Sequence, residues 1–396
     1  MTATHSEPLA YPFNVDAGLD LDEAYATARE AEGMIRVKMS YGEPAWLATR
    51  YADARLVLGD RRFSRAMEKE KDAPRLTPLV RDGGILQMDP PDHTRLRTLV
   101  AKAFTMRRVE LIRPRVAALA AELIAGMKTA GPPADLVDAY ALPIPVAVIC
   151  ELLGVPVADR PKFRVWSDAA LSTSGLTLEE FERNREELRD YMRGLIADHR
   201  VRPQDDLMTA LIEARDVRDR LTELELVDLC VGILIAGHET TASQIPNFVY
   251  ALQDQHEQWE RLCAEPGLIP AAVEELMRFV PLGAGAAFAR YATEDIEVGG
   301  VLVRAGEPVL IAIGAANRDG LQFDDADKLS FDRSENHHLG FGHGVHHCLG
   351  APLARLELQE ALRALVTEMP ELRLAGDIVW KTQMIVRGPR TMPIGW

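Results

Sequence analysis

The chain has 396 residues, of which 47% are hydrophobic and 27% charged, and its formal net charge at neutral pH is −15. This composition is that of a globular protein and excludes disordered and fibrous chains. The acidic balance argues against a nucleic-acid partner, which needs a basic surface. The apolar runs are much shorter than the roughly 18 residues of a membrane span, and no signal peptide is expected. A cytoplasmic protein without a membrane contact is predicted.

The N-terminal quarter mixes helix and strand patterns, and the middle of the chain is mostly helical. Leu19–Ala31 has a helical pattern, whereas Ile35–Met39 and Ala45–Thr49 have strand patterns separated by a turn with glycine and proline. These two strands are predicted to form a β-hairpin. From about Asp92 to Gln258, apolar residues recur mainly at helical spacing.

The C-terminal third returns to strand patterns. Val301–Val303 and Pro308–Ile313 flank the turn Arg304–Gly306 and predict a second hairpin. A long loop is expected at Asn317–Leu339, followed by one more helix and short strands. The fold class is therefore mainly α with a smaller β-rich subregion. No linker divides the chain, so residues 1–396 are expected to form a single domain.

The loop that contains Cys348 is the most informative segment. Between Phe341 and Pro352 the chain carries three glycines within ten residues, which allow a tight backbone path with positive φ. Pro352 suits the first turn of a helix, so Cys348 is expected just before a helix N-terminus. That position stabilises a thiolate. A fixed thiolate is a suitable axial ligand of haem iron, which makes Cys348 the candidate metal ligand.

Two other interpretations of this segment stay open. Cys348 could be a buried structural cysteine, like Cys150 and Cys230, which lie in apolar runs. Five of the ten histidines lie between His337 and His347, which could indicate a zinc site. Against zinc, no second cysteine lies nearby, and the three glycines would remain unexplained.

A long helix is predicted in the middle of the chain. Thr222 and Glu225 form a capping box at its start, and it continues to about Leu252. The segment Cys230–Ala236 is apolar on all faces and is therefore expected to be buried. Pro246 should kink or end the helix.

A polar break follows the apolar segment of this helix at Gly237-His238-Glu239-Thr240-Thr241. An acid and hydroxyls inside a buried helix are costly without a purpose. One interpretation is that Thr240 hydrogen-bonds to a carbonyl of the preceding turn and bends the helix. The other is a local opening that admits dioxygen and water, with Glu239 and Thr240 as the candidate catalytic pair.

Two pairs of charged residues have helical spacing. Glu275 and Arg278 share a face and could form an ordinary surface ion pair. His93 and Arg97 place two cations four residues apart, which is unfavourable unless an anion lies opposite. The two propionates of a haem would supply that anion; the alternative is a solvated basic face. The segment Arg95–Lys128 is also basic and is either solvated or a docking face for an acidic electron donor.

The segment Phe341–Gly350 reads F-G-x-G-x-H-x-C-x-G and resembles, at every fixed position, the haem-ligand signature of the cytochrome P450 monooxygenases. The resemblance extends in order over nearly the whole chain. It implies the cytochrome P450 fold, with haem b between the long central helix and the cysteine loop. It also implies that Cys348 is the axial ligand and that Glu239 and Thr240 are the acid and the alcohol that deliver protons.

Further site residues follow from the same resemblance. Arg333 would join Glu275 and Arg278 in a structural lock. The positions that match propionate-binding residues are His93, Arg97, Arg290 and His346. Activity as a monooxygenase on a small molecule would need dioxygen and electrons from a ferredoxin and an NAD(P)H-dependent ferredoxin reductase, and a monomer is expected. The alternatives are a peroxygenase, which would not need Glu239 and Thr240, and a haem-based gas sensor or carrier.

The substrate expectation rests on a narrower resemblance. Runs at Tyr11–Asn14, Phe279–Gly283 and Leu339–Arg355 are similar to actinobacterial macrolide-tailoring members of the family. They predict hydroxylation or epoxidation of a bulky natural product, a macrolide or another polyketide, with a steroid, a terpenoid or a fatty acid as alternatives. The expected pocket walls are Ser64–Gly84, Leu171–Thr177, Ile233–Ala236, Leu282–Phe288 and Gln383–Val386.

Overall fold

The computed structural model describes residues 7–14, 18–80, 82–173, 176–217, 220–283, 285 and 288–396. The chain divides into two compact units, and each unit is built from two separate stretches of sequence. The β-rich unit comprises Met1–His93 and Glu274–Cys348, and the helical unit comprises Thr94–Val273 and Leu349–Trp396. Most of the structure is helical, as the sequence predicts.

A six-stranded sheet organises the β-rich unit, with the strand order β1-β2-β3-β9-β6-β4. The strands are β1 (Leu9–Ala10), β2 (Ile35–Lys38), β3 (Ala45–Ala48), β4 (Phe63–Ser64), β6 (Arg290–Ala292) and β9 (Pro308–Ile311). Strands β2 and β3 pair antiparallel, which confirms the first predicted hairpin. Strand β3 then pairs parallel with β9, so the centre of the sheet joins two distant parts of the chain.

The second predicted hairpin is wrong. Strand β8 (Val301–Val303) pairs with the preceding strand β7 (Ile296–Val298), whereas β9 joins the large sheet. The reason lies in the turn between β7 and β8, where Gly299 and Gly300 both have positive φ, 56° and 80°. Two such residues form the tight turn that antiparallel strands prefer, and this pairing takes β8 away from β9.

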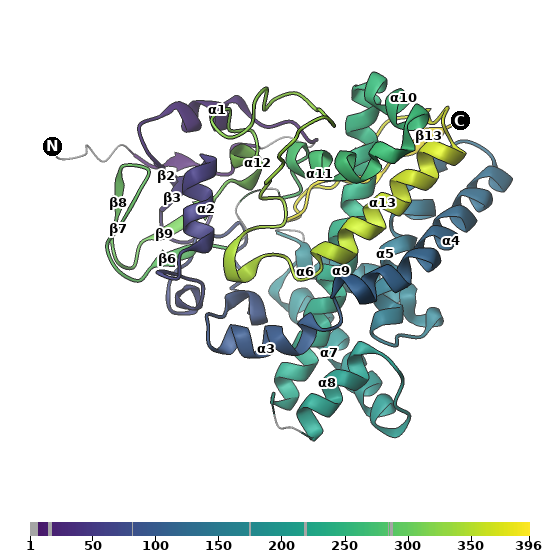
Figure 1. Cartoon of the computed structure of the whole chain (residues 1–396). Coiled ribbons are helices and arrows are strands. Elements are labelled where there is room, and N and C mark those ends of the chain that lie inside the picture. The colour runs from purple at the N-terminus through teal and green to yellow at the C-terminus, as the bar shows by residue number, and fades with distance from the viewer. Residues whose placement is uncertain are drawn as a thin grey trace. The chain divides into compact units, whose positions relative to one another are not determined.

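Both faces of the large sheet are covered by apolar side chains. Along β9, Val309 and Ile311 contribute to one buried cluster and Leu310 contributes to the other, because successive side chains of a strand point to opposite faces. Helix α2 (Tyr51–Gly59) packs on the Val309 face, and Figure 1 shows it beside the strands. Helix α1 (Glu23–Glu30) contributes Tyr25 to the other face.

Short elements and loops complete the β-rich unit. They include the 3-10 helices η1 (Ala66–Glu70), η2 (Gly84–Gln87) and η6 (Gly344–His346), and the α-helices α11 (Ile269–Phe279, which begins in the other unit) and α12 (Ile313–Ala316). Between Asn317 and Leu339, all of which is described, the chain forms turns without helix or strand. This confirms the predicted long loop.

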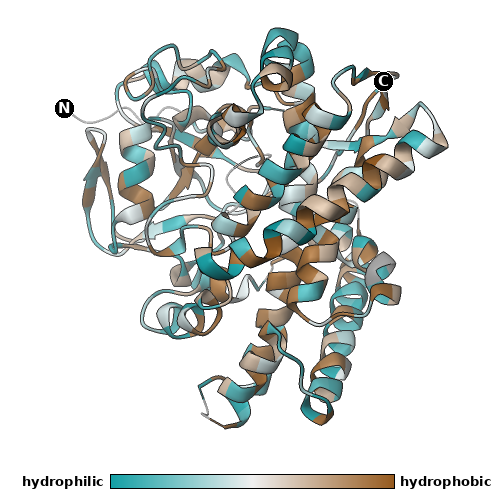
Figure 2. Cartoon of the chain, turned by 45° about the vertical axis from the view of Figure 1, so that its right-hand side comes forward, coloured by the Kyte–Doolittle hydropathy of each residue, from teal (hydrophilic) through white to brown (hydrophobic). Residues whose placement is uncertain are grey.

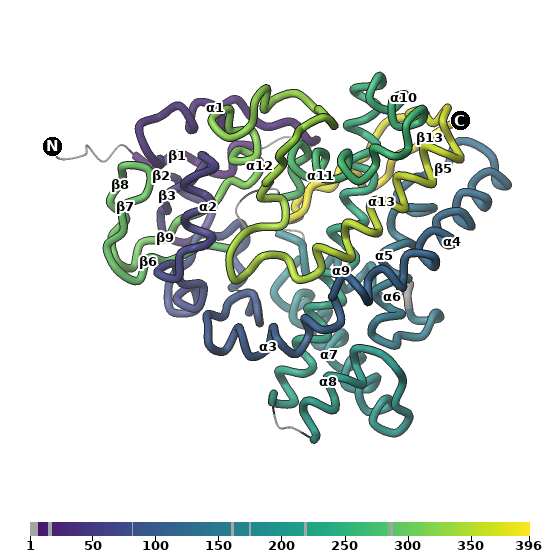
Figure 3. The backbone as a smooth tube through the Cα atoms, in the orientation of Figure 1, coloured from purple at the N-terminus to yellow at the C-terminus, as the bar shows by residue number. Residues whose placement is uncertain are grey.

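The helical unit consists mainly of α-helices, whose polar and apolar residues alternate along the ribbons in Figure 2. The helices are α3 (Asp92–Ala101), α4 (Met106–Ala130), α5 (Pro143–Leu152), α6 (Arg160–Leu171), α7 (Leu178–Val201), α8 (Leu207–Asp216), α9 (Glu223–Asp254), α10 (His256–Ala264) and α13 (Ala351–Glu368). Helices α4 and α13 run alongside each other, as Figure 3 shows. The short strands are β5 (Ala134–Asp135), β10 (Arg373–Leu374), β11 (Val379–Trp380), β12 (Pro389–Thr391) and β13 (Pro393–Gly395).

Helix α9 begins with the predicted capping box, in which Thr222 and Glu225 bond reciprocally. Pro246 does not end the helix, which continues to Asp254. Every residue of the run 241–249 is buried, and this packing compensates for the backbone hydrogen bond that a proline cannot make. By length and composition alone α9 could cross a membrane, but 56% of its apolar window is buried, as in the core helices of globular proteins.

The prediction that the apolar segment of α9 is buried is wrong for one face. Gly232 and Ala236 are exposed, and Thr240 is half-buried. These residues are four apart and therefore form one line along the helix. The line carries almost no side-chain bulk until Thr240, so the backbone of α9 is accessible beside this hydroxyl.

Candidate functional site

Cys348 lies at the end of a loop whose backbone requires glycine. Gly342 and Gly344 have φ angles of 73° and 71°, and a Cβ atom on Gly344 would collide with the backbone carbonyl of Leu58. The amide of Cys348 donates to the carbonyl of Phe341 over 2.8 Å. Helix α13 starts three residues after Cys348 with a proline in its first turn. The predicted position of this cysteine before a helix N-terminus is confirmed.

The cysteines differ sharply in their accessibility. Cys150 and Cys230 are completely buried, as expected for core residues, whereas Cys348 is exposed. Burial raises the pKa of Cys230 to about 12, so this thiol stays protonated and inert at neutral pH. The interpretation of Cys348 as a buried structural cysteine is therefore wrong. Its thiol is accessible to a ligand or a metal.

The histidines near Cys348 turn to different partners and do not converge. His338 contacts the Glu274 carboxylate over 3.1 Å, and His337 lies 3.9 Å from the Glu335 carboxylate. The ring of His346 lies against that of His93. Within the described residues, no group of three or more His, Cys, Asp or Glu side chains could hold a metal, so these histidines do not assemble the zinc site considered above.

Two of the predicted propionate-binding residues are in direct contact within the β-rich unit. The ring centroids of His93, on α3, and His346, on η6, lie 4.2 Å apart, and His93 is 2% exposed. Arg97 follows His93 by one turn of α3 and is half-buried. Two imidazoles at this distance would repel each other when both are charged, and an anion beside them would offset that repulsion.

Arg290 belongs to a second cluster of the same unit. It is 3% exposed on β6, and its burial lowers its pKa to about 10, an effect that nearby Asp89 and Glu68 oppose. Sequence reasoning missed a second arginine in this cluster, Arg65. Burial and the charge of Arg290 lower the pKa of Arg65 to about 9. No sequence motif signals Arg65, because only the folded chain buries it beside Arg290.

The environment of Arg65 shows that this cluster has capacity for a further anion. Its guanidinium stacks over the ring of Phe288 at 4.7 Å and donates to the carbonyl of Leu86 over 2.7 Å. Its buried Nε atom has no hydrogen-bond partner among the described residues. An accessible thiol and buried guanidiniums form a donor set that fits haem b, whose iron accepts a thiolate and whose propionates accept cationic donors.

The predicted acid of α9 is held by a lysine that sequence reasoning missed. Glu239 is 3% exposed and forms an ion pair with Lys381, whose ammonium group also lies 2.9 Å from the Ser243 hydroxyl. The Thr240 hydroxyl donates to the carbonyl of Ala236 over 3.0 Å. The backbone hydrogen bond of the first interpretation is therefore present. Lys381 lies more than 140 residues from Glu239, and no spacing rule could have linked them.

His238 precedes the acid and is completely buried. Its Nδ1 atom lies 2.7 Å from the carbonyl of Leu234, and its Nε2 atom lies 3.0 Å from the Ser167 hydroxyl. Burial lowers the pKa of His238, so the ring is neutral at pH 7. Since a carbonyl only accepts, the proton is on Nδ1 and Nε2 accepts from Ser167. His238 therefore anchors α9 to α6.

Glu357, on α13, is a buried acid that the sequence did not single out. It is 1% exposed, it hydrogen-bonds to Thr241, and burial raises its pKa to about 8. Its Oε1 atom has no partner among the described residues. Because the unfolded chain ionises this group near pH 4, folding takes up a proton between about pH 4 and pH 8. Its contribution to stability is full below that window and is lost as the pH rises through it.

We therefore expect Glu357→Gln to flatten the decline of stability with rising pH. As the pH rises through the window, the unfolding free energy of the variant minus that of the parent should increase by roughly 1 kcal/mol per pH unit. The measurement is the thermal unfolding midpoint of both proteins at a series of pH values from 5 to 9. Glu368→Gln, at an exposed position of the same helix, should leave the slope unchanged. Parallel curves for the parent and Glu357→Gln would contradict the expectation.

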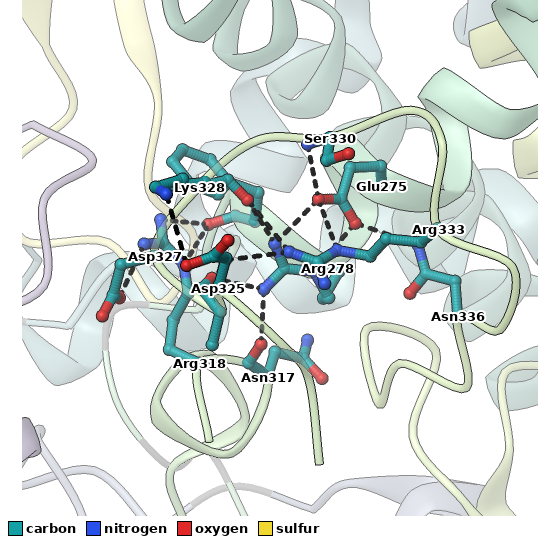
Figure 4. A network of polar contacts seen from close by, with 12 residues as sticks. Glu275, Arg278, Asn317, Arg318, Asp325, Asp327, Lys328, Ser330, Arg333 and Asn336 are labelled. Atoms are coloured by element: carbon teal, nitrogen blue, oxygen red, sulfur yellow. Dashed lines mark hydrogen bonds and ion pairs between the residues drawn. The ribbon is translucent and has the colours of Figure 1, made fainter. Parts of the chain in front are cut away.

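The pair Glu275 and Arg278 is a buried lock and not a surface ion pair, as Figure 4 shows. Both side chains are at most 1% exposed, and their two N···O contacts are 2.8 Å long. Arg333 donates to Glu275 over 2.9 Å, which confirms the predicted third member. Arg278 also donates to the backbone carbonyls of Asn317, Ala326 and Lys328. The lock fixes the path of the long loop after α12.

The basic segment Arg95–Lys128 is partly neutralised by carboxylates. The ion pairs join Arg95 to Glu225, Arg113 to Glu110 and Glu360, Arg115 to Glu151, and Lys128 to Glu368. Lys102, Arg107 and Arg108 lie on the exposed surface. The cationic face is thus smaller than the count of basic residues indicates.

Comparisons with known proteins agree with this geometry. The family model described as Cytochrome P450 matches residues 158–369. The mycinamicin IV hydroxylase/epoxidase of Micromonospora griseorubida is 53% identical over 396 residues, with 99% of this chain and 100% of the relative covered. The nocardicin C N-oxygenase of Nocardia uniformis subsp. tsuyamanensis is 48% identical over 399 residues, with coverages of 99% and 100%.

A solved structure extends the likeness to the fold. The LnmZ cytochrome P450 hydroxylase from the leinamycin biosynthetic pathway of Streptomyces atroolivaceus S-140 is 55% identical, with a TM-score of 0.87, and the match covers 99% of this chain and 100% of that chain. The exposed thiol, the cationic clusters and the full-length similarity lead to one conclusion. The chain belongs to the cytochrome P450 family and is a haem-binding monooxygenase that uses dioxygen, redox partners and a small-molecule substrate.

Proposed function

We propose that this monooxygenase hydroxylates or epoxidises a bulky natural product, a macrolide or another polyketide. The observation that carries the proposal is the similarity over the full length to an enzyme named for mycinamicin IV. The similarity to a nocardicin C N-oxygenase favours oxidation at nitrogen as a second candidate reaction. A steroid, a terpenoid or a fatty acid remains the alternative substrate class.

We propose that Cys348 would bind the haem iron through its thiolate and that His93, Arg97, Arg290 and His346 would bind the propionates. The contact between the two imidazoles and the burial of Arg290 support this assignment. When bound, the haem supplies the reducible iron at which dioxygen is activated. These cationic side chains would neutralise the haem carboxylates, and Cys348 would supply the thiolate for the iron.

We further propose that Glu239 and Thr240 move protons during this reaction. The Thr240 hydroxyl lies at the end of the accessible line of Gly232 and Ala236, where a small molecule can approach α9. Thr240 would hold a proton at Oγ1 and release it when its hydrogen bond to Ala236 opens. After separating from Lys381, the Glu239 carboxylate would take up a proton from solvent and, as a carboxylic acid, donate it to the Thr240 oxygen.

The remaining parts of the proposal concern partners and organisation. We propose that a ferredoxin and its NAD(P)H-dependent reductase supply the electrons, and that an acidic ferredoxin is steered by the exposed residues Lys102, Arg107 and Arg108. We also propose that residues 1–396 work as one monomeric cytochrome P450 domain in the cytoplasm.

A pair of titrations tests the substrate class. Several predicted pocket walls have small or polar residues, which suit a large ligand. The wall residues that lie outside the described part of the chain are Arg81, Ser174, Gly175, Ala284, Ala286 and Ala287. We expect a mycinamicin macrolide to produce an optical shift of the haem at a lower concentration than a linear fatty acid does. Both titrations use one preparation of the purified holoenzyme. Tighter binding of the fatty acid, without a response to any macrolide, would refute the macrolide proposal and leave the monooxygenase activity standing.

A further inference from the structure

A short C-terminal segment, Lys381–Gly388, forms a closed loop on the helical unit. The amide of Lys381 donates to the carbonyl of Gly388 over 2.8 Å, which joins the two ends of the segment. The side chain of Asn247, on α9, donates to the carbonyl of Arg387 over 3.1 Å. We call this segment the C-terminal strap. At one end, the strap is attached to α9 through the backbone carbonyl of Arg387.

The other end of the strap is attached to α9 through Lys381. Its side chain is 7% exposed and that of Glu239 is 4% exposed, so the ion pair is almost fully removed from water. The Ser243 hydroxyl, one turn after Glu239, lies 2.9 Å from the Lys381 ammonium group and donates to the backbone carbonyl of Glu239. Because a buried charge without a partner is unstable, the carboxylate is confined to the face of α9 where Lys381 and Ser243 lie.

The middle of the strap contacts the chain at the end of α6. The amide of Thr173 donates to the carbonyl of Gln383 over 2.7 Å, and the amide of Ile385 donates to the carbonyl of Leu171 over 3.0 Å. These backbone contacts join two segments that the sequence places among the walls of the substrate pocket. The strap therefore connects the segment Leu171–Thr173 with the acid of α9.

We propose that Lys381 is a positioning residue that holds the Glu239 carboxylate beside Ser243 and ties the acid to the C-terminal strap. The proposal rests on the proton-delivery role given to Glu239 above. Thr240 projects from α9 about 100° around the helix axis from Glu239, so a carboxylate held by Lys381 is turned away from the hydroxyl that it serves. Lys381 thereby determines the position of the Glu239 carboxylate between proton transfers.

Substitutions at both ends of the ion pair test this role. Lys381→Met removes the charge with little change in length, and Lys381→Arg keeps it. Glu239→Gln and Thr240→Ala provide the reference defects in proton delivery, and the double variant Glu239→Gln/Lys381→Met removes both charges. Arg390→Met is the matched control, because Arg390 follows the strap and forms a half-exposed ion pair with Asp168.

Two measurements on the holoenzyme separate positioning from folding. The first is the yield of product per reduced nicotinamide consumed, measured in light water and again in heavy water. The substrate is the compound that binds more tightly in the titrations above. The second is the thermal unfolding midpoint, which does not depend on turnover. We expect Lys381→Met to lower the product yield several-fold with more hydrogen peroxide, because the Glu239 carboxylate then no longer returns to one position between proton transfers. The same defect is expected for Glu239→Gln and Thr240→Ala, and Lys381→Arg should recover most of the yield. Arg390→Met should resemble the parent.

The double variant shows whether Lys381 acts through Glu239 or independently of it. We expect it to have the same yield as Glu239→Gln alone and a higher unfolding midpoint than Lys381→Met, because no buried carboxylate is left without its partner. It also keeps the test decisive if Lys381→Met does not fold. The role of Lys381 would be overturned if the losses of product yield in the two single variants add in the double variant. It would also be overturned if Lys381→Met has the yield of the parent while Glu239→Gln is impaired. A parental yield for Glu239→Gln would instead refute the proton-delivery role itself.

Discussion

Replacement of Cys348 by alanine or histidine is expected to abolish the red-shifted Soret band of the reduced carbon monoxide complex. That band requires a thiolate bound to the haem iron, and Cys348 is the exposed cysteine of the chain, in a glycine-containing loop before α13. The measurement is the difference spectrum of purified, reduced protein with and without carbon monoxide.

Cys263 provides the control for this experiment, because it is half-buried on α10. Cys263→Ala should keep the band at full intensity. A Cys348→Ala protein that retained the band would mean that another cysteine binds the iron.

Arg278→Met is expected to cause a large loss of stability. The substitution leaves Glu275 buried with only part of its partners and removes donors from three backbone carbonyls of the long loop. Breaking a buried ion pair on one side costs about 3–5 kcal/mol. We expect a much lower thermal unfolding midpoint and a reduced haem content per chain after purification.

An exposed ion pair supplies the comparison for the lock. Arg304→Met removes a partner of Asp295 in a pair whose side chains are 67% and 47% exposed, so its effect should be less than about 1 kcal/mol. Equal unfolding midpoints for the two variants would show that the lock does not stabilise the fold.

The sequence predicted the parts of this protein that depend on local chemistry. Gly344 and Cys348 lie in one short motif, whose spacing determines the backbone path, and Thr222 caps α9 through a residue three positions away. The residues that were missed, Arg65 and Lys381, depend on partners from distant parts of the chain. The second hairpin was wrong for a related reason: β9 has three possible neighbours, and only the assembled sheet selects among them.

The parallel pairing of β3 with β9 also determines when the β-rich unit can be completed during synthesis. More than 250 residues separate Ala48 from its partner Ile311, and a ribosome adds about 5–20 residues per second. For tens of seconds the nascent hairpin therefore has an open strand edge, which is a site for wrong pairing with other chains. A chain truncated before Pro308 would keep that edge permanently, so nascent-chain capture by chaperones should be strongest until β9 leaves the ribosome.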